Sequence, residues 1–285
     1  MTTYAITGAT GPLGRLVIDA LLAKGVPASD VVAIARTPPK AADLAARGVV
    51  VREGDYSRPE TLPAALRDVT NLLLISGNEV GRRVPQHTAV IEAARAAGVA
   101  RIAYTSILRA DSSELSLAAE HKATEIVLRE SGVPFTLLRN SWYTENYTGQ
   151  LGRYLERGEI LGAAGDGRIS AATRADYAAA AAAALTGEGH DNAVYELGGT
   201  PFTLTELATT ITEVTGTKVV YRDVTVPELA GVLQSAGLDE GTAHFVAGLD
   251  GAIARGGLDT PGDDLSRLIG RPGTPPADAV RAAAS

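Results

Sequence analysis

Short apolar and β-branched runs alternate along the first half of the chain with longer segments rich in alanine and leucine. Such short runs are typical of buried strands, whereas the longer segments place apolar residues three and four positions apart, as a helix does. The pattern predicts strands at residues 4–7, 31–35, 49–52, 71–76, 101–106 and 135–139. It predicts helices between them at residues 13–24, 41–46, 61–66, 86–97 and 117–129.

Strands joined by helical crossovers pair in parallel, and helices then cover both faces of their sheet. The run from Leu72 to Ile75 is apolar throughout, as expected for a strand that is buried on both faces. The sequence therefore predicts an α/β protein with a Rossmann-like, doubly wound parallel sheet.

The alternation loosens after about Asn140, where frequent glycines divide the chain into short pieces. An alanine-rich helix is predicted at residues 175–185 and an amphipathic helix at 203–215, with strands at 194–197 and 218–223. These elements indicate a smaller C-terminal lobe. The tail from Arg271 is rich in proline and alanine, so we expect it to be loosely held.

Composition narrows the class of protein. The net charge of -7 would repel a phosphate backbone, so nucleic acid is not an expected partner. No segment reaches the roughly 18 apolar residues of a membrane span, and no basic region precedes an apolar stretch at the N-terminus, so we expect a cytoplasmic protein without membrane insertion. The chain has no cysteine, and its four histidines lack any ligand spacing, so no metal site is predicted.

The clearest chemical motif lies between the first strand and the first helix and reads Gly8-Ala9-Thr10-Gly11-Pro12-Leu13-Gly14. Its glycines permit a tight turn, a close approach of the backbone to a pyrophosphate and close packing of the helix on the sheet. The N–H groups that begin the helix attract phosphate. The motif predicts a dinucleotide site that includes Gly8, Thr10, Gly11, Pro12 and Leu13. A glycine turn without a ligand is the alternative.

Arg36 directly follows the second predicted strand, where Rossmann proteins select their ribose. An acid at this position would accept hydrogen bonds from a free 2′-hydroxyl, whereas a guanidinium offers two donors to a 2′-phosphate. Arg36 therefore predicts NADPH as the cofactor. A solvated surface arginine is the alternative.

The tyrosine and lysine of the usual short-chain dehydrogenase site, Tyr-x-x-x-Lys, are missing. None of the nine tyrosines is followed by a lysine four residues later, and Ala118 stands where the tyrosine would lie. Reduction of a simple ketone produces a basic alkoxide that needs an acid nearby. A quinone instead gives a resonance-stabilised phenolate that water can protonate, so the sequence favours a quinone-type acceptor.

Three residues are candidates for the catalytic site. His121 could donate a proton or orient the acceptor, although it lies on a helical face with Leu117 and could equally be a buried, satisfied histidine. Asn140 and Tyr143 follow the last strand of the core, in a segment that holds the only tryptophan. Ligands of open α/β sheets bind at this edge, where Asn140 could donate a hydrogen bond and Tyr143 could stack. Packing of the lobe on the sheet is the alternative.

These features resemble the NmrA-like atypical short-chain dehydrogenases, and among them the bacterial NADPH:quinone oxidoreductases. Beyond the glycine motif, the likeness includes Ala103-Tyr104-Thr105-Ser106, Glu120-His121, Leu137-Leu138-Arg139-Asn140, Ala172-Thr173-Arg174-Ala175-Asp176-Tyr177-Ala178 and Val194-Tyr195-Glu196-Leu197. The chain departs from the family at Gly77-Asn78, where serines are usual, and at Lys122, where an apolar residue is common.

The resemblance implies NADPH without flavin or metal, with Ser76 and Thr105 lining the nicotinamide end. It suggests Asp55 and Tyr56 as contacts of the adenine end, although Asp55 could simply be a turn aspartate. Lys122 could hold the nicotinamide ribose or be a solvated helix lysine.

We expect residues 1–148 to form the dinucleotide-binding core, with returns of the chain near 170–200, and residues 149–285 to form mostly a substrate-side lobe and cap. The expected activity is hydride transfer from NADPH to a quinone-type acceptor. Two alternatives stay open: a non-enzymatic NADP(H)-sensing regulator, and a reductase or isomerase of another conjugated carbonyl or a nucleotide sugar.

Overall fold

A parallel sheet of seven strands forms the centre of the computed structural model, which describes residues 2–260 and 262–285. The strands follow one another in the order β3-β2-β1-β4-β5-β6-β8. Their bounds are β1 Tyr4–Ile6, β2 Val31–Ala35, β3 Val50–Glu53, β4 Asn71–Leu74, β5 Arg101–Ile107, β6 Phe135–Asn140 and β8 Ala193–Leu197. The order reverses between β1 and β4, and the diverging connections at this point leave a crevice at the carboxyl ends of the strands. The predicted doubly wound Rossmann-like fold is confirmed.

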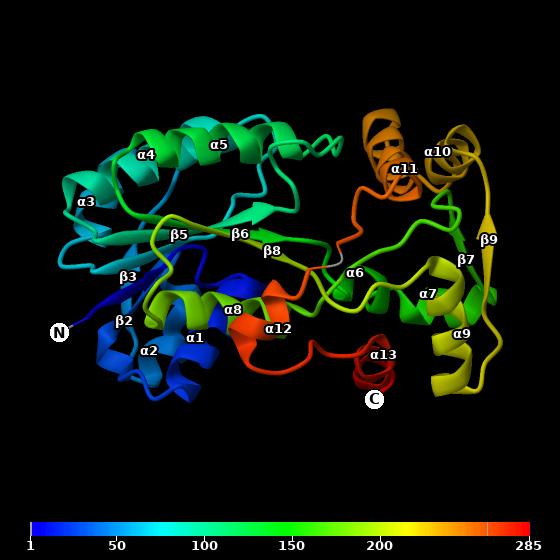
Figure 1. The fold of residues 1–285 in the computed structure, drawn as a ribbon, viewed down its shortest axis with the longest axis horizontal. Helices are drawn as coiled ribbons and strands as arrows, with labels where there is room; N and C mark the ends of the chain where they lie inside the picture. The colour runs from blue at the N-terminus through cyan, green and yellow to red at the C-terminus, as the bar shows by residue number, and fades with distance from the viewer. Residues whose placement is uncertain (1, 261) are drawn as a thin grey trace.

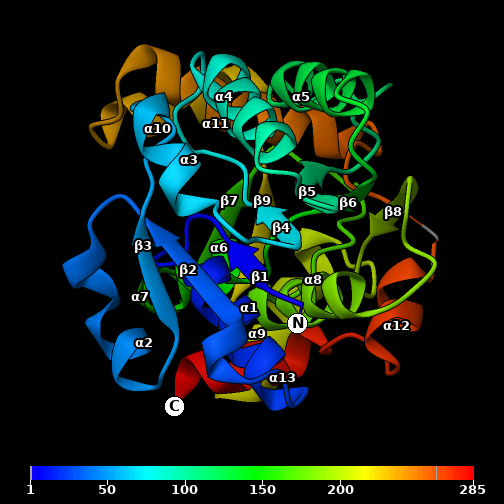
Figure 2. The ribbon, with the colours of Figure 1, turned by 90° about the vertical axis from the view of Figure 1, so that its left-hand side faces the viewer.

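Two layers of helices cover the sheet, as Figures 1 and 2 show from two directions. One face carries α1 (Pro12–Ala23), α2 (Ala42–Ala46), α8 (Arg174–Thr186) and α12 (Asp264–Ile269). The other face carries α3 (Leu62–Ala65), α4 (Arg83–Ala96) and α5 (Ala118–Glu130). Because both faces are covered, a central strand such as β2 is buried along its whole length and has no polar residue.

Close packing of α1 on α8 fixes the first helix beneath the sheet. The alanine-rich sequence of α8 buries mostly methyl groups, which let the two helices approach closely. The Thr173 hydroxyl accepts a hydrogen bond from the Asp176 N–H and so defines where α8 begins. The predicted helix at residues 175–185 is confirmed, and it helps to hold the turn that precedes α1.

The C-terminal lobe lies beyond the carboxyl ends of the strands, where β6 leads into α6 (Figure 1). It contains α6 (Glu145–Thr148), α7 (Leu151–Arg157), α9 (Leu204–Thr215), α10 (Val226–Ser235), α11 (Glu240–Ala254), α13 (Pro276–Ala284) and the parallel pair β7 (Glu159–Gly162) and β9 (Val220–Asp223). The expectation of a loosely held tail is wrong. Helix α13 packs against α9, and Val280 is fully buried in the core of the lobe.

Candidate functional site

A tight turn connects β1 to α1 and is built from backbone alone. Gly8 has a φ of 58°, in the left-handed region that suits glycine. A Cβ atom on Gly14 would collide with the carbonyl oxygen of Gly8, so only glycine lets the helix sit this close to the turn. Gly11 is the N-cap and Pro12 begins the helix, without a side chain that caps it. The N–H groups of the first turn are therefore available to an anion.

The turn opens into a groove of about 610 Å³ at the topological switch of the sheet. The groove brings together ten of the residues that the sequence singled out: Gly8, Thr10, Gly11, Pro12, Leu13, Arg36, Asp55, Tyr56, Ser76 and Tyr143. Its other polar and charged side chains include Arg15, Lys40, Gln86 and Arg174, which the sequence did not predict as site residues. Four of the predicted residues do not line it: Thr105, His121, Lys122 and Asn140.

Basic side chains mark the end of the groove that lies beyond β2. Arg36 and Lys40 line it, and Arg36 Nη1 lies 3.4 Å from Glu79 Oε1 on the loop after β4. The same carboxylate lies 3.4 Å from Arg82. Since these pairs are partly exposed, they are weak and can rearrange around a stronger anion. This end of the groove can accept a phosphate beyond the two of a pyrophosphate.

Asp55 and Tyr56, which follow β3, are already engaged within the protein. Asp55 Oδ1 accepts a hydrogen bond from the Ser57 N–H at 2.9 Å, as in an Asx turn. The Tyr56 hydroxyl donates to the carbonyl oxygen of Ile75 at 2.9 Å, and burial raises its pKa well above the usual range. Tyr56 therefore stays neutral and connects the segment after β3 to the loop after β4.

The loop after β4 is held from behind by buried side chains. The Ser76 N–H donates to Thr105 Oγ1 at 2.8 Å, and the Gly77 N–H donates to His87 Nε2 at 2.9 Å. Arg83 also donates to the Gly77 carbonyl oxygen. Ser76 faces the groove, whereas Thr105 supports it from the neighbouring strand. His87 was not predicted as a site residue, because a lone histidine gives no signal of what it will contact.

His121 points into the interior between α5 and the sheet. It is 6% exposed, and its Nδ1 lies 2.8 Å from the hydroxyl of Tyr104. Burial, with the positive charge of Arg83, lowers the pKa of His121 to about 3, so the ring is neutral near pH 7. The structure gives this residue the surroundings of a satisfied buried histidine.

Lys122 is the next residue along α5 and lies on the exposed side of the helix. Its side chain is exposed, and Nζ lies 3.2 Å from the carbonyl oxygen of Asp111. The structure does not bring Lys122 to the groove, because its helical position turns it away from the sheet.

Tyr143 and Arg174 stand together at the other end of the groove. The guanidinium of Arg174 lies 4.4 Å from the centre of the Tyr143 ring, a cation–π contact. The ring also packs edge-on against Tyr177 at 5.6 Å. Burial raises the pKa of Tyr143, so its hydroxyl is protonated at neutral pH.

Asn140 ends β6 just before this pair and is buried. Its side-chain amide lies close enough to the Tyr143 hydroxyl to influence its pKa. Among the described residues, no group forms a hydrogen bond with the Asn140 Oδ1 atom. A buried acceptor without a partner is uncommon and marks Asn140 as a polar group with unused capacity beside the groove.

Neither a metal-ligand cluster nor a membrane-spanning helix is present among the described residues. No group of three or more His, Cys, Asp or Glu side chains among them could hold a metal ion. No helix in the described ranges has the length and apolar character that a membrane span requires.

The fold and the groove together define a dinucleotide-binding protein of the Rossmann type. An uncapped helix N-terminus faces the groove at the switch point, and the basic end fits a dinucleotide that carries a third phosphate. The chain belongs to the NAD(P)H-binding family, whose sequence profile matches residues 8–188.

Full-length relatives support this assignment. The chain is 52% identical to quinone oxidoreductase 2 of Escherichia coli over 97% of this chain and 96% of that protein. It is 37% identical to an NmrA-like family domain-containing oxidoreductase of Aspergillus flavus over 98% of this chain and 94% of that protein. The predicted membership of the NmrA-like group is confirmed.

The crystal structure of NADPH-dependent quinone oxidoreductase from Escherichia coli in complex with NADPH has the same fold. It superposes with a TM-score of 0.96 at 50% sequence identity, covering 99% of this chain and all of that chain.

Proposed function

We propose that this protein reduces quinones by hydride transfer from NADPH. The proposal is supported by the similarity to quinone oxidoreductase 2 along nearly the whole chain and by a groove that fits a dinucleotide with an additional phosphate. The acceptor gains a hydride and a proton and becomes a hydroquinone.

The cofactor would be held mainly by the first turn of α1 and by Arg36. The N–H groups that follow Gly11 would bind the pyrophosphate, and the Arg36 guanidinium would leave Glu79 to bind the 2′-phosphate. Ser76 would line the nicotinamide end, with Thr105 keeping its loop in place. When bound there, NADPH supplies the hydride.

The observation that carries the proposal is the lack of an acid where a ketone reductase needs one. Ala118 stands at the position of the usual tyrosine and is buried. His121 is neutral, and the hydroxyl of Tyr143 has a raised pKa, so neither gives up a proton readily at neutral pH. A quinone suits such a site, because its reduced oxygen is stabilised by the ring and water can protonate it.

Tyr143, Asn140 and Arg174 would position the acceptor. The Tyr143 ring offers a flat face in the groove, and Asn140, which is buried just before it at the end of β6, would donate a hydrogen bond from its amide nitrogen to a carbonyl oxygen. The positive charge of Arg174 at the same end favours negative charge on that oxygen as the hydride arrives.

The test is NADPH oxidation by the purified protein with 1,4-benzoquinone, beside a simple ketone such as cyclohexanone at the same concentration. We expect many turnovers with the quinone and none above background with the ketone. Tight NADPH binding without consumption would instead indicate a sensor. Equal rates with both acceptors would refute the argument from the missing acid, and a wider screen of conjugated carbonyls would then identify the substrate.

A further inference from the structure

A second cavity borders the segment that follows β6, which also contributes Tyr143 to the groove. It has a volume of about 430 Å³ and lies between the loop that precedes α5, the end of β6 and helix α11. Its size falls within the range of small-molecule sites. No residue lines both this cavity and the dinucleotide groove.

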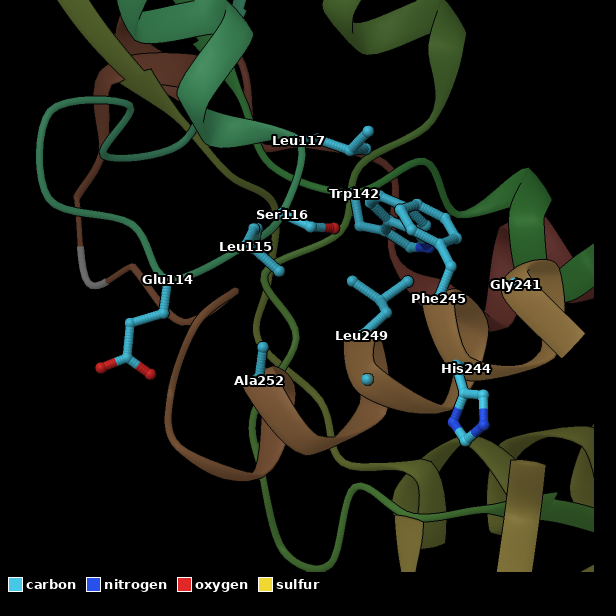
Figure 3. A pocket seen from close by; sticks show the side chains of 11 residues that line it. Glu114, Leu115, Ser116, Leu117, Trp142, Gly241, His244, Phe245, Leu249 and Ala252 are labelled. Carbon is cyan, nitrogen blue, oxygen red and sulfur yellow. The ribbon is translucent and has the colours of Figure 1, made fainter. Parts of the chain in front are cut away.

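The walls of this cavity are largely apolar. They include Leu115, Leu117, Trp142, Phe245, Leu249 and Ala252. Figure 3 shows the Trp142 indole facing the side chains of α11, while the polar ends of Glu114 and His244 point away from the apolar centre. Phe245 is 40% exposed, which is unusual for so large an apolar side chain. Exposed apolar surface around a hollow is typical of a ligand site.

The cavity adjoins the acceptor end of the groove through two consecutive residues. The Trp142 side chain lines the cavity, and the next residue, Tyr143, lines the groove. Consecutive Cα atoms are about 3.8 Å apart. The cavity and the acceptor end of the groove therefore border the same short segment of backbone.

We propose that this cavity binds the alkyl or isoprenoid chain of a substituted quinone while the quinone ring lies at Tyr143. The inference rests on the proposed function and specifies its substrate class. A chain fits these walls because they present aromatic and aliphatic side chains without a buried charged group directed at the centre. Each methylene group that leaves water strengthens binding about four-fold.

Two glycines on neighbouring helices provide a matched test. Gly248 on α11 lines the cavity, and a Cβ atom there would meet no atom within 4 Å. Gly231 on α10 has equally open surroundings but does not line the cavity. Leucine is a better helix former than glycine at either position, so neither substitution should unfold the protein.

The first measurement compares decyl-substituted benzoquinone with unsubstituted 1,4-benzoquinone. In Gly248→Leu the new side chain would fill the cavity, and the ratio of kcat/KM for the decyl compound to that for benzoquinone should fall at least about ten-fold. In Gly231→Leu the ratio should match the unmodified protein. An unchanged ratio in Gly248→Leu would overturn the proposal.

The second measurement does not depend on turnover. Trp142 is the only tryptophan, so its fluorescence reports directly on the cavity. Titration with 1-decanol should give a saturable change in the unmodified protein and in Gly231→Leu, and none in Gly248→Leu. Absence of the change in the unmodified protein would overturn the apolar-chain site. If quinones are not reduced but decanol still binds, the proposed function fails while the cavity keeps its affinity for a chain.

Discussion

The two ends of the dinucleotide groove are built from different parts of the chain. At the phosphate end, Gly8, Gly11 and Gly14 shape a backbone turn, and the binding groups are N–H groups at the start of α1. At the acceptor end, the groups that face the groove are the side chains of Tyr143 and Arg174, supported by buried neighbours. The phosphate end therefore depends on glycines, which have no side chain to block the backbone N–H groups. The acceptor end depends on the chemical groups that its side chains present.

This difference predicts how each end responds to substitution. A backbone site tolerates no added bulk or negative charge, so a single change there should remove cofactor binding altogether. A site made of several neutral side chains loses one contact at a time, and each neutral hydrogen bond contributes only about 0.5 to 1.5 kcal/mol.

The largest effect is expected from Gly11→Asp. The new carboxylate would stand at the N-terminus of α1, where it would compete with the pyrophosphate and repel it. Like charges placed together cost several kcal/mol, so NADPH affinity should fall at least about a hundred-fold, while circular dichroism shows a folded protein. Gly152→Asp, on α7 with open surroundings, is the control and should bind normally. Unchanged affinity in a folded Gly11→Asp protein would place the cofactor elsewhere.

His87, which holds the loop after β4 from behind, should make the stability of the protein depend on pH. Burial, with nearby Arg83, lowers the pKa of His87 from 6.5 to about 4, so protons bind more readily to the unfolded chain. The stabilisation is complete above pH 6.5 and is lost as the pH falls to about 4, and it amounts to about 3 kcal/mol. Urea unfolding of His87→Gln should show a shallower loss of stability over this range.

His244→Gln is the matched control for that experiment, because His244 lies exposed on α11. It should follow the unmodified protein at every pH. If His87→Gln and the unmodified protein lose stability in parallel between pH 6.5 and pH 4, His87 is not buried in its neutral form.

Much of the fold can be predicted from the sequence because strands that are buried on both faces of the sheet are apolar throughout. Strand β2 is apolar throughout, and α1 spaces its buried residues as a helix does. Helices α10 and α11 were not predicted, and α10 buries only Leu229 and Ala230. A capping box of Thr225 and Glu228 is the local signal that could have located α10.

The residues of the candidate site also divide into those that the sequence predicts and those that it does not. The glycine turn is local, so its residues converge in the structure as the sequence predicts. His121 and Lys122 are neighbours on α5, and the apolar face that His121 shares with Leu117 indicated that His121 could be buried, but no local pattern showed that His121 would bond to Tyr104 instead of the acceptor. Arg174 reaches Tyr143 because the segment before α8 lies beside the segment after β6, and the sequence did not predict this contact between distant parts of the chain.

A moderate effect on cofactor binding is expected at Arg36, the side chain that we propose binds the 2′-phosphate. A hydrogen bond to a charged group is worth about 1.5 to 3 kcal/mol, so Arg36→Asp should weaken NADPH binding roughly ten- to a hundred-fold and reverse the preference over NADH. Arg82→Asp makes the same charge change at the other partner of Glu79 but away from the groove lining, and should keep the preference. Equal dissociation constants of the unmodified protein for both nucleotides would show that Arg36 does not select the ribose.

The smallest effects are expected at the acceptor end, from Tyr143→Phe and Asn140→Ala. Tyr143→Phe removes a neutral hydroxyl but keeps the ring contacts with Tyr177 and Arg174, and Asn140→Ala removes an amide whose oxygen forms no bond within the described residues. Each loss of about 0.5 to 1.5 kcal/mol should lower kcat/KM for benzoquinone by a few-fold to about ten-fold, with the NADPH dissociation constant unchanged. His121→Gln is the decisive comparison, since glutamine can still bond to Tyr104 and the histidine is buried between α5 and the sheet. If His121→Gln alone stops turnover while the other two variants stay fully active, the acceptor binds against α5. The contrast between a phosphate end built from backbone and an acceptor end built from several weakly contributing side chains would then be wrong.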